Sequence, residues 1–174
     1  MEIYERQVLS LVFLIGMPGV GKSYWGRQLA QHFRIPFFDL DRFIVQQEKS
    51  SISDLFDHVG EEKFRQKEHG YLAKLITEAK PGTVIACGGG TPCYHDNMRL
   101  MNTAGITVYL EADAVHLLKN MHYTLEMRPL LRGKEDVNAF LAQLLEQRKP
   151  YYEQAQHILQ TEYISLATFE KIIF

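Results

Sequence analysis

The amino-acid sequence predicts an α/β fold, a three-layer sandwich in which helices cover both faces of a mainly parallel sheet. Short segments typical of strands alternate with longer segments of helical periodicity along the whole chain. The first strand-like segment, residues 8–15, is apolar on both faces, which is typical of a buried parallel strand. Because 174 residues are enough for one domain and few for two, we expect a single domain over residues 1–174.

The first half of the chain indicates two strands and three helices. In chain order they are residues 8–15, a helix at 22–33, the strand segment "IPFFDLD", a short helix, and a helix at 61–79. The helix at 22–33 is predicted by large apolar residues that recur every four positions. Ser51 or Ser53 is expected to cap the short helix, Gly60 to separate it from the longer one, and Pro81-Gly82 to end that helix.

The second half of the chain continues the alternation. The predicted elements are the strand "TVIACGGG", a helix at 96–102, a strand at 106–110, helices at 113–119 and 135–147, a strand at 157–159 and a C-terminal helix. Residues 120–134 lack a clear period and contain a proline and a glycine, so we expect a mobile loop there. Pro150 is expected to interrupt or restart the preceding helix.

Composition limits the class of protein and its partners. The net charge of -2 argues against nucleic acid as the main partner, but small anionic ligands need only a local cluster of cations. Cys87 and Cys93 have no second pair for a zinc site, and they favour a reducing cytoplasm. The longest apolar run near the start is too short to span a membrane. We therefore expect a cytoplasmic monomer that acts on small molecules.

The segment "GMPGVGKS", residues 16–23, fits G-x-x-x-x-G-K-[ST] at every fixed position and lies between a strand and a helix. In such a P-loop the backbone N–H groups must approach phosphate oxygens, and side chains would block that approach. A glycine-rich turn without a ligand is the alternative. We predict that Lys22 reaches the β- and γ-phosphates of ATP and that the Ser23 hydroxyl ligates Mg²⁺. The predicted nucleotide-binding residues of this segment are Gly16, Met17, Pro18, Gly19, Val20, Gly21, Lys22, Ser23 and Tyr24.

The carboxylates of the "DLD" segment follow the second predicted strand. Strand alternation would place Asp39 and Asp41 on the same side. One is expected to hold the water molecules of magnesium or to take a proton from an attacking hydroxyl, and the other to accept hydrogen bonds from substrate hydroxyls. The alternatives are that Asp41 caps the next helix and that Asp39 bonds to nearby backbone.

The segment "GEEKFRQKEHG" places Arg65 four residues after Glu61 and three before Glu68. Either glutamate can pair with the arginine on one helix face. A solvated surface ion pair is one interpretation. The other is that Glu68 orients Arg65 while its guanidinium binds a ligand carboxylate, which the neighbouring Phe64 favours.

Three further segments contain candidate ligand-binding residues. The "CGGGTP" segment follows a strand with three residues that lack Cβ, so either it makes a tight turn or something packs against its backbone. "EMRPLLRG" contains Arg128 and Arg132, of which one is expected to stabilise charge on the transferring phosphate unless both are solvated. Arg148 in "QRKPYYEQA" is a second candidate for binding a carboxylate, with helix-end charge as the alternative.

Taken together, these segments resemble the shikimate kinase family, in the nucleoside-monophosphate-kinase-like branch of P-loop proteins. The matching pieces are GMPGVGKS, DLD, GEEKFRQKE, CGGG, RPLL and the R-x-x-Y of RKPYY, in the order of the family, from residue 16 to about 155. The resemblance implies a P-loop kinase with a five-stranded parallel sheet in the order 2-3-1-4-5. It also implies phosphorylation of the 3-hydroxyl of shikimate by ATP, in chorismate and aromatic amino-acid biosynthesis.

The resemblance implies a role for each matching residue, with ATP as co-substrate and one Mg²⁺ per subunit. The catalytic residues would be Lys22, Asp39 and Arg128, with Arg128 also contacting the nucleotide from the mobile lid at 120–134. The metal would be held by Ser23 and, through water, by Asp39. The residues expected to bind shikimate are Asp41, Arg65, Gly88, Gly89, Gly90 and Arg148.

Two features of the family have no counterpart here. They are an arginine shortly before RPLL and a proline in the loop before the last helix, which lie on either side of the adenine. The adenine contacts are therefore not predicted. Two other functions stay open: a kinase of the same branch acting on gluconate or a nucleoside monophosphate, and a nucleotide-binding regulatory module without turnover.

Overall fold

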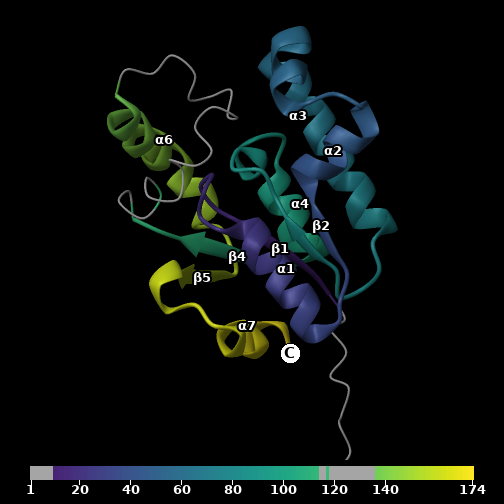
Figure 1. Cartoon of the computed structure of the whole chain (residues 1–174), viewed down its shortest axis with the longest axis vertical. Helices are drawn as coiled ribbons and strands as arrows, with labels where there is room; N and C mark the ends of the chain where they lie inside the picture. Colours follow the sequence, from purple (N-terminus) through teal and green to yellow (C-terminus); the bar gives the residue numbers. More distant parts are fainter. Residues whose placement is uncertain (1–9, 114–116, 118–135) are drawn as a thin grey trace, which may run out of the picture.

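Five strands form one parallel sheet in the order β2-β3-β1-β4-β5 (Figure 1). The computed structural model of the chain describes residues 10–113, 117 and 136–174. The strands are β1 (Leu11–Ile15), β2 (Phe37–Asp39), β3 (Val84–Ala86), β4 (Gly105–Glu111) and β5 (His157–Gln160). The predicted fold class and strand order are confirmed.

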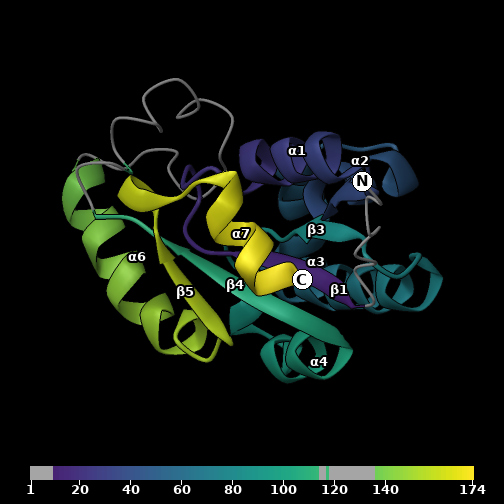
Figure 2. The same cartoon turned by 90° about the horizontal axis from the view of Figure 1, so that it is seen from below.

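The helices connect these strands in a way that fixes which face each one covers. They are α1 (Lys22–Phe33), α2 (Leu40–Glu48), α3 (Ile52–Glu78), α4 (Asn97–Ala104), α6 (Val137–Tyr152) and α7 (Leu166–Ile173), with short 3₁₀ helices η1 (Thr91–Cys93) and η4 (Thr161–Tyr163). The connection from β1 to β2 leads toward the β2 edge of the sheet. The connections from β2 to β3, from β3 to β4 and from β4 to β5 lead toward the opposite edge. Since such crossovers are right-handed, the reversal places α1 and α4 on opposite faces (Figure 2).

The central strand β1 is buried along its whole length, with no residue more than 7% exposed. It pairs with β3 on one side and β4 on the other. α7 packs beside α1, where the rings of Trp25 and Phe169 lie 5.6 Å apart. The change of crossover direction at β1 is the position where open α/β sheets bind ligands, at the carboxyl ends of the strands.

Polar side-chain contacts connect α2 to α3. Glu48 of α2 accepts hydrogen bonds from Lys67 Nζ at 2.8 Å and from the Tyr71 hydroxyl at 2.7 Å, both on α3. Burial and the Glu48 hydrogen bond raise the pKa of Tyr71 to about 12, so the phenol stays protonated as a donor. No helix in the described ranges is both long enough and apolar enough to cross a membrane.

Most predicted element boundaries agree with the structure. Ser51 caps α3 by accepting from the Asp54 N–H, and Gly60, with φ 78°, breaks the helix at the predicted place. The prediction for Pro150 is wrong, because α6 continues through it to Tyr152. Pro150 lies in the last turn, where its missing N–H removes one bond and Glu153 N–H still closes the helix on the Lys149 carbonyl at 2.9 Å. The predicted loop at 120–134 and most of the predicted helix at 113–119 lie outside the described residues.

Candidate active site

The P-loop runs from the end of β1 into α1 with its main chain exposed to the site. Gly16, Gly19 and Gly21 have φ values of 137°, 82° and 100°, and a Cβ on Gly16 would lie 2.6 Å from the Leu110 carbonyl oxygen. The side chains of Met17 and Val20 are buried in the core. The loop therefore places its apolar side chains in the core and leaves backbone N–H groups at the N-terminus of α1 for an anion.

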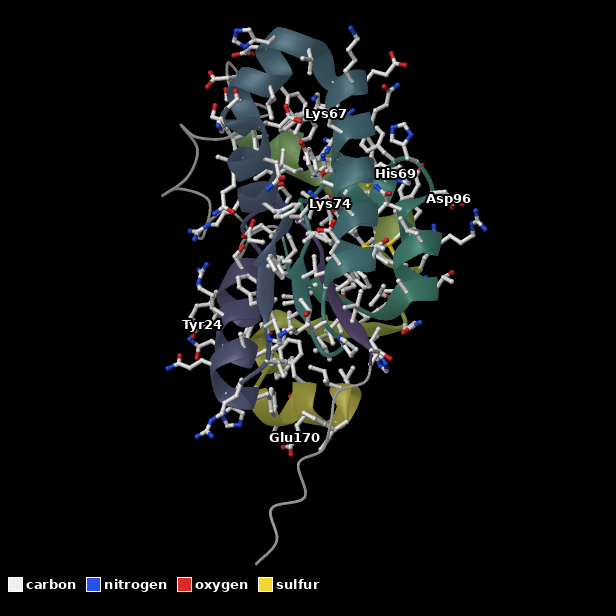
Figure 3. The ribbon with its side chains drawn as sticks, turned by 90° about the vertical axis from the view of Figure 1, so that its right-hand side faces the viewer. Tyr24, Lys67, His69, Lys74, Asp96 and Glu170 are labelled. Atoms are coloured by element: carbon white, nitrogen blue, oxygen red, sulfur yellow. The ribbon has the colours of Figure 1, made fainter. Side chains whose placement is uncertain are left out.

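Lys22 closes this loop from the first turn of α1. It is buried, and its Nζ donates to the carbonyls of Gly16 at 2.9 Å and Met17 at 2.8 Å. The ammonium charge therefore lies within the loop that is predicted to hold the phosphates. Tyr24, the last residue of the predicted nucleotide set, is mostly exposed on α1 (Figure 3).

Ser23 and Asp39 form a pair of oxygen donors beside the P-loop. The Ser23 hydroxyl donates to Asp39 Oδ2. Asp39 Oδ1 accepts from the Arg42 N–H at 3.2 Å and so caps α2. The alternative that Asp41 caps this helix is wrong, because the strand ends at Asp39 and the helix begins at Leu40.

Asp41 lies in the first turn of α2, so strand alternation is the wrong reason for grouping it with Asp39. It nevertheless faces the segment Gly88–Gly90, which we call the glycine loop. A Cβ on Gly88 would lie 2.9 Å from Asp41 Oδ1. Helix geometry, rather than the pleat of a strand, thus brings this carboxylate to the carboxyl end of β3.

Arg65 is a buried ion-pair partner, and the interpretation as a solvated surface pair is wrong. Only 4% of the residue is exposed, and its Nη1 donates to Glu68 Oε2 at 2.8 Å. Burial disfavours the guanidinium charge, but Glu68, with smaller contributions from Tyr94 and Glu61, outweighs burial and raises the pKa of Arg65 above its ordinary value. The rings of Phe56, Phe64 and Tyr94 surround its Cζ at 5.5, 5.3 and 4.6 Å. Its Nε is buried and has no partner among the described residues.

The glycine loop allows these groups to approach its backbone. A Cβ on Gly90 would lie 2.5 Å from Arg65 Nη2, and one on Gly89 would lie 2.6 Å from Pro18 of the P-loop. The loop also turns, since Thr91 N–H donates to the Gly88 carbonyl at 3.1 Å. A tight turn and close packing against the backbone were the two alternatives for this segment, and the glycine loop shows both. Its close contacts with Pro18 and Arg65 connect the P-loop to Arg65.

Replacing Gly90 with alanine is expected to displace the Arg65 guanidinium, because the new methyl group would overlap it. We expect kcat/KM for the carboxylate-bearing substrate to fall about tenfold or more, since small displacements of a positioning group are costly. Gly70→Ala is the matched control: nothing lies within 4 Å of its Cβ position on α3, and alanine should stabilise the helix by about 0.5–1 kcal/mol. Equal activity of the two variants in steady-state assays would contradict this placement.

Arg148 reaches the same region from α6. It is 6% exposed, and its Nη1 has no partner in the part of the chain that the structure describes. Burial raises the pKa of the Cys93 thiol to about 11, opposed by the positive charges of Arg148 and Arg65. Both arginines come from helices that contact η1, which contains Cys93, and the burial of Arg148 contradicts its interpretation as a solvated helix-end charge.

Three contributors to the site were not predicted. Thr91 Oγ1 donates to Glu68 Oε1 at 2.6 Å and fixes the glutamate that orients Arg65. The Tyr152 hydroxyl donates to the Gly89 carbonyl at 2.6 Å, and burial raises the pKa of this phenol above its ordinary value. Tyr94 covers Arg65. Only the position of Thr91 directly after the three glycines could have indicated such a role.

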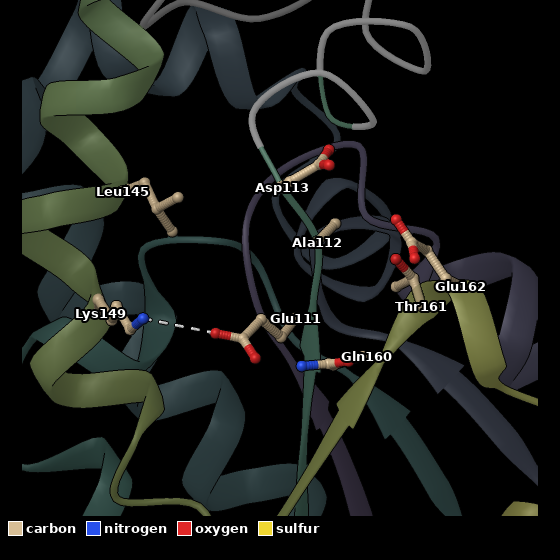
Figure 4. A pocket seen from close by; sticks show the side chains of 8 residues that line it. All are labelled: Glu111, Ala112, Asp113, Leu145, Lys149, Gln160, Thr161 and Glu162. Carbon is tan, nitrogen blue, oxygen red and sulfur yellow. Dashed lines mark ion pairs between the residues drawn. The ribbon is translucent and has the colours of Figure 1, made fainter.

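A cavity of about 360 Å³ lies at the carboxyl ends of β4 and β5, beside α6 (Figure 4). Its lining is Glu111, Ala112, Asp113, Leu145, Lys149, Gln160, Thr161 and Glu162. Lys149 pairs with Glu111 at 3.5 Å, and the lining contains three carboxylates but only one lysine. The cavity contains none of the predicted site residues, and its acidic lining does not favour a phosphate.

All predicted site residues except Arg128 fall in the described ranges and lie at the carboxyl ends of β1, β2 and β3 or on helices that reach them. Arg128 lies outside the described residues. Within those ranges no cluster of three His, Cys, Asp or Glu side chains could hold a metal by itself. Hard cations in phosphoryl-transfer sites take few protein ligands and complete their coordination with phosphates and water, which Ser23 and Asp39 suit.

Comparisons with known proteins agree with the geometry. The sequence model of the family described as shikimate kinase matches residues 18–173. The shikimate kinase of Bacteroides fragilis is 40% identical over 149 residues, 84% of this chain and 82% of that protein. The crystal structure of shikimate kinase from Bacteroides thetaiotaomicron has a TM-score of 0.82 and 35% identity over 94% of both chains. That of the Acinetobacter baumannii shikimate kinase in complex with shikimate has a TM-score of 0.85 and 31% identity over 95% of this chain and 90% of the other.

Proposed function

The chain belongs to the shikimate kinase family, and from this premise we propose that it transfers the γ-phosphoryl group of ATP to the 3-hydroxyl of shikimate. One observation carries the proposal. Arg65 and Arg148 come from α3 and α6, which both contact η1 directly after the glycine loop, and each has a buried N–H donor without a partner among the described residues. Buried unpaired donors of this kind are costly unless a ligand satisfies them, and the carboxylate of shikimate is such a ligand.

We propose that the P-loop and Lys22 bind the phosphates of ATP. The backbone N–H groups and the N-terminus of α1 offer fixed dipoles, and Lys22 adds a full positive charge from inside the loop. Because phosphoryl transfer requires little covalent chemistry from a protein, the main contributions are positioning and charge stabilisation. Arg128 remains a predicted contributor to charge stabilisation.

The residues present fit one Mg²⁺ per subunit. The Ser23 hydroxyl and the Asp39 carboxylate are neighbouring hard oxygen donors beside the P-loop. We propose that Ser23 ligates the metal directly and that Asp39 contacts it through water. When bound, the ion would neutralise charge on the phosphates.

Asp39→Asn is expected to weaken the response to Mg²⁺ while leaving the fold intact. Asparagine caps helices as well as aspartate does, so the start of α2 is retained, but the charge next to Ser23 is lost. We expect the Mg²⁺ concentration for half-maximal rate to rise about tenfold, which corresponds to roughly 1.4 kcal/mol. Asp136→Asn is the control, since Asp136 caps α6 in the same way through the Ala139 N–H. An equal magnesium dependence in both variants would show that Asp39 does not take part in the metal site.

The acceptor is proposed to bind between α2, α3, α6 and the glycine loop. Arg65 and Arg148 would bind its carboxylate, Asp41 its ring hydroxyls, and Gly88, Gly89 and Gly90 would allow its close approach. Two arginines and one aspartate suit a hydroxylated carboxylate better than a nucleotide, which needs a phosphate site and a base pocket.

A coupled ADP-release assay across shikimate, gluconate and nucleoside monophosphates tests the proposal. We expect ADP release that depends on shikimate and on added Mg²⁺. No release with shikimate would refute the proposed activity, and release with gluconate or a nucleoside monophosphate alone would assign the acceptor differently. Binding of ATP and shikimate by calorimetry without product would indicate a silent module. The cytoplasmic location and monomeric state stay predictions.

A further inference from the structure

Two carboxylates of the protein contact the Arg65 guanidinium, and they differ in how firmly they are held. Glu68 Oε2 accepts from Nη1 at 2.8 Å, and Glu61 Oε1 accepts from Nη2 at 3.3 Å. The Glu68 side chain is 1% exposed, whereas that of Glu61 is 47% exposed. Glu68 is also bound by Thr91 through its other oxygen at 2.6 Å. Glu68 is therefore fixed, and Glu61 can move into water.

Tyr94 holds Glu61 in contact with Arg65. The Tyr94 hydroxyl donates at 3.1 Å to Oε1 of Glu61, the oxygen that also accepts from Arg65 Nη2. The Tyr94 ring lies 4.6 Å from Arg65 Cζ and covers one face of the guanidinium. The residue is 37% exposed, so this arrangement lies at the outer side of the site.

Glu61 contacts Nη2, a nitrogen of Arg65 that a ligand carboxylate can use together with Nε. Nη2 and Nε point to the same side of an arginine, and a carboxylate that binds this edge takes one proton from each. Nε is the buried donor of Arg65 that has no partner in the described ranges. Of the two nitrogens of this edge, Nη2 is in contact with Glu61 and Nε is unpaired among the described residues.

We propose that Glu61 is an internal competitor of the substrate carboxylate for Arg65, held in place by Tyr94 and displaced into solvent when the substrate binds. The inference rests on the proposed function. Its physical basis is charge balance: a substrate carboxylate brings a third anion to Arg65 and Arg148, and Glu61 is the one that can leave. Glu61 would thus weaken binding of the substrate carboxylate. Because it partly neutralises Arg65, it would also weaken the binding of other anions there.

Glu61→Gln tests the proposal by removing the competing charge while keeping the size of the side chain. We expect the KM for shikimate to fall about two- to fivefold, the range for a half-exposed ion pair. The KM for ATP and kcat should change little, because the effect is on ground-state binding of one substrate. Tyr94→Phe keeps the ring over Arg65 and removes the hydroxyl, so it should shift the KM for shikimate in the same direction by a smaller factor.

Glu62→Gln is the matched control, because it removes the same charge from the next position of α3, where the side chain is exposed. A KM for shikimate that rises or stays constant in Glu61→Gln, or that falls equally in Glu62→Gln, overturns the proposal. Wild-type turnover is measured in the same assay. A wild type without shikimate-dependent ADP release overturns the proposed function together with this inference, whereas an active wild type with an unaltered Glu61→Gln overturns the inference alone.

Discussion

Lys22→Met is expected to lower kcat by about 10²- to 10³-fold or more, the range for loss of one preorganised charge at the transferring group. Methionine keeps the apolar stem of the side chain in its buried position, so the fold should be retained. The variant gives up the Nζ bonds to the Gly16 and Met17 carbonyls. We therefore expect a thermal midpoint within a few degrees of the wild type. Steady-state kinetics and thermal unfolding on the same preparation check both parts.

The control for this variant is Lys171→Met, the same chemical change at an exposed position on α7. It should keep full turnover. If Lys22→Met unfolds like the wild type and still turns over at a comparable rate, the P-loop lysine has no role in catalysis.

Arg148→Met is expected to lower kcat/KM for shikimate by about 10²-fold or more, while the thermal midpoint stays the same or rises. Truncating one partner of a buried, hydrogen-bonded charge pair in a complex typically costs about 2–5 kcal/mol of binding. In the protein without substrate, the same guanidinium is buried with Nη1 unpaired among the described residues, so an apolar side chain of similar length removes a desolvation cost. The variant therefore separates stability from function.

The measurements are kcat/KM for each substrate and the thermal midpoint with and without shikimate. Shikimate should raise the midpoint of the wild type and leave that of Arg148→Met unaltered, because a ligand stabilises only the state that binds it. Lys149→Met, the next residue of α6 and half exposed, controls for loss of a positive charge. A large fall in the midpoint of Arg148→Met, with shikimate turnover retained, would make Arg148 a structural residue.

Local patterns were enough to predict the P-loop, α1 and the partners of Arg65. In each case the interacting residues are close in sequence: Lys22 contacts carbonyls five and six residues away, and Glu61 and Glu68 lie within one helical turn of Arg65. The order of the strands followed from the resemblance to a family, because sequence periodicity carries no information on which strands pair.

The parts that sequence could not provide depend on packing between distant segments. Tyr94 reaches Glu61 from another element, and Tyr152 reaches Gly89 across the site. Strand alternation was the wrong basis for grouping Asp41 with Asp39, because the strand ends at Asp39 and Asp41 lies on the helix that begins at Leu40. Burial of Arg65 and Arg148 was also unpredictable, since spacing alone does not distinguish a surface ion pair from a buried one.

The bond from the Tyr152 hydroxyl to the Gly89 carbonyl joins the last third of the chain to a loop near its middle. On the ribosome, every P-loop residue leaves the exit tunnel before α6, which supplies both Tyr152 and Arg148, has been synthesised. A nascent chain at that stage carries the proposed phosphate-binding segment but only one of the two arginines that we propose for the acceptor. On this proposal, the site for the acceptor is completed late in translation, after the segment for the donor.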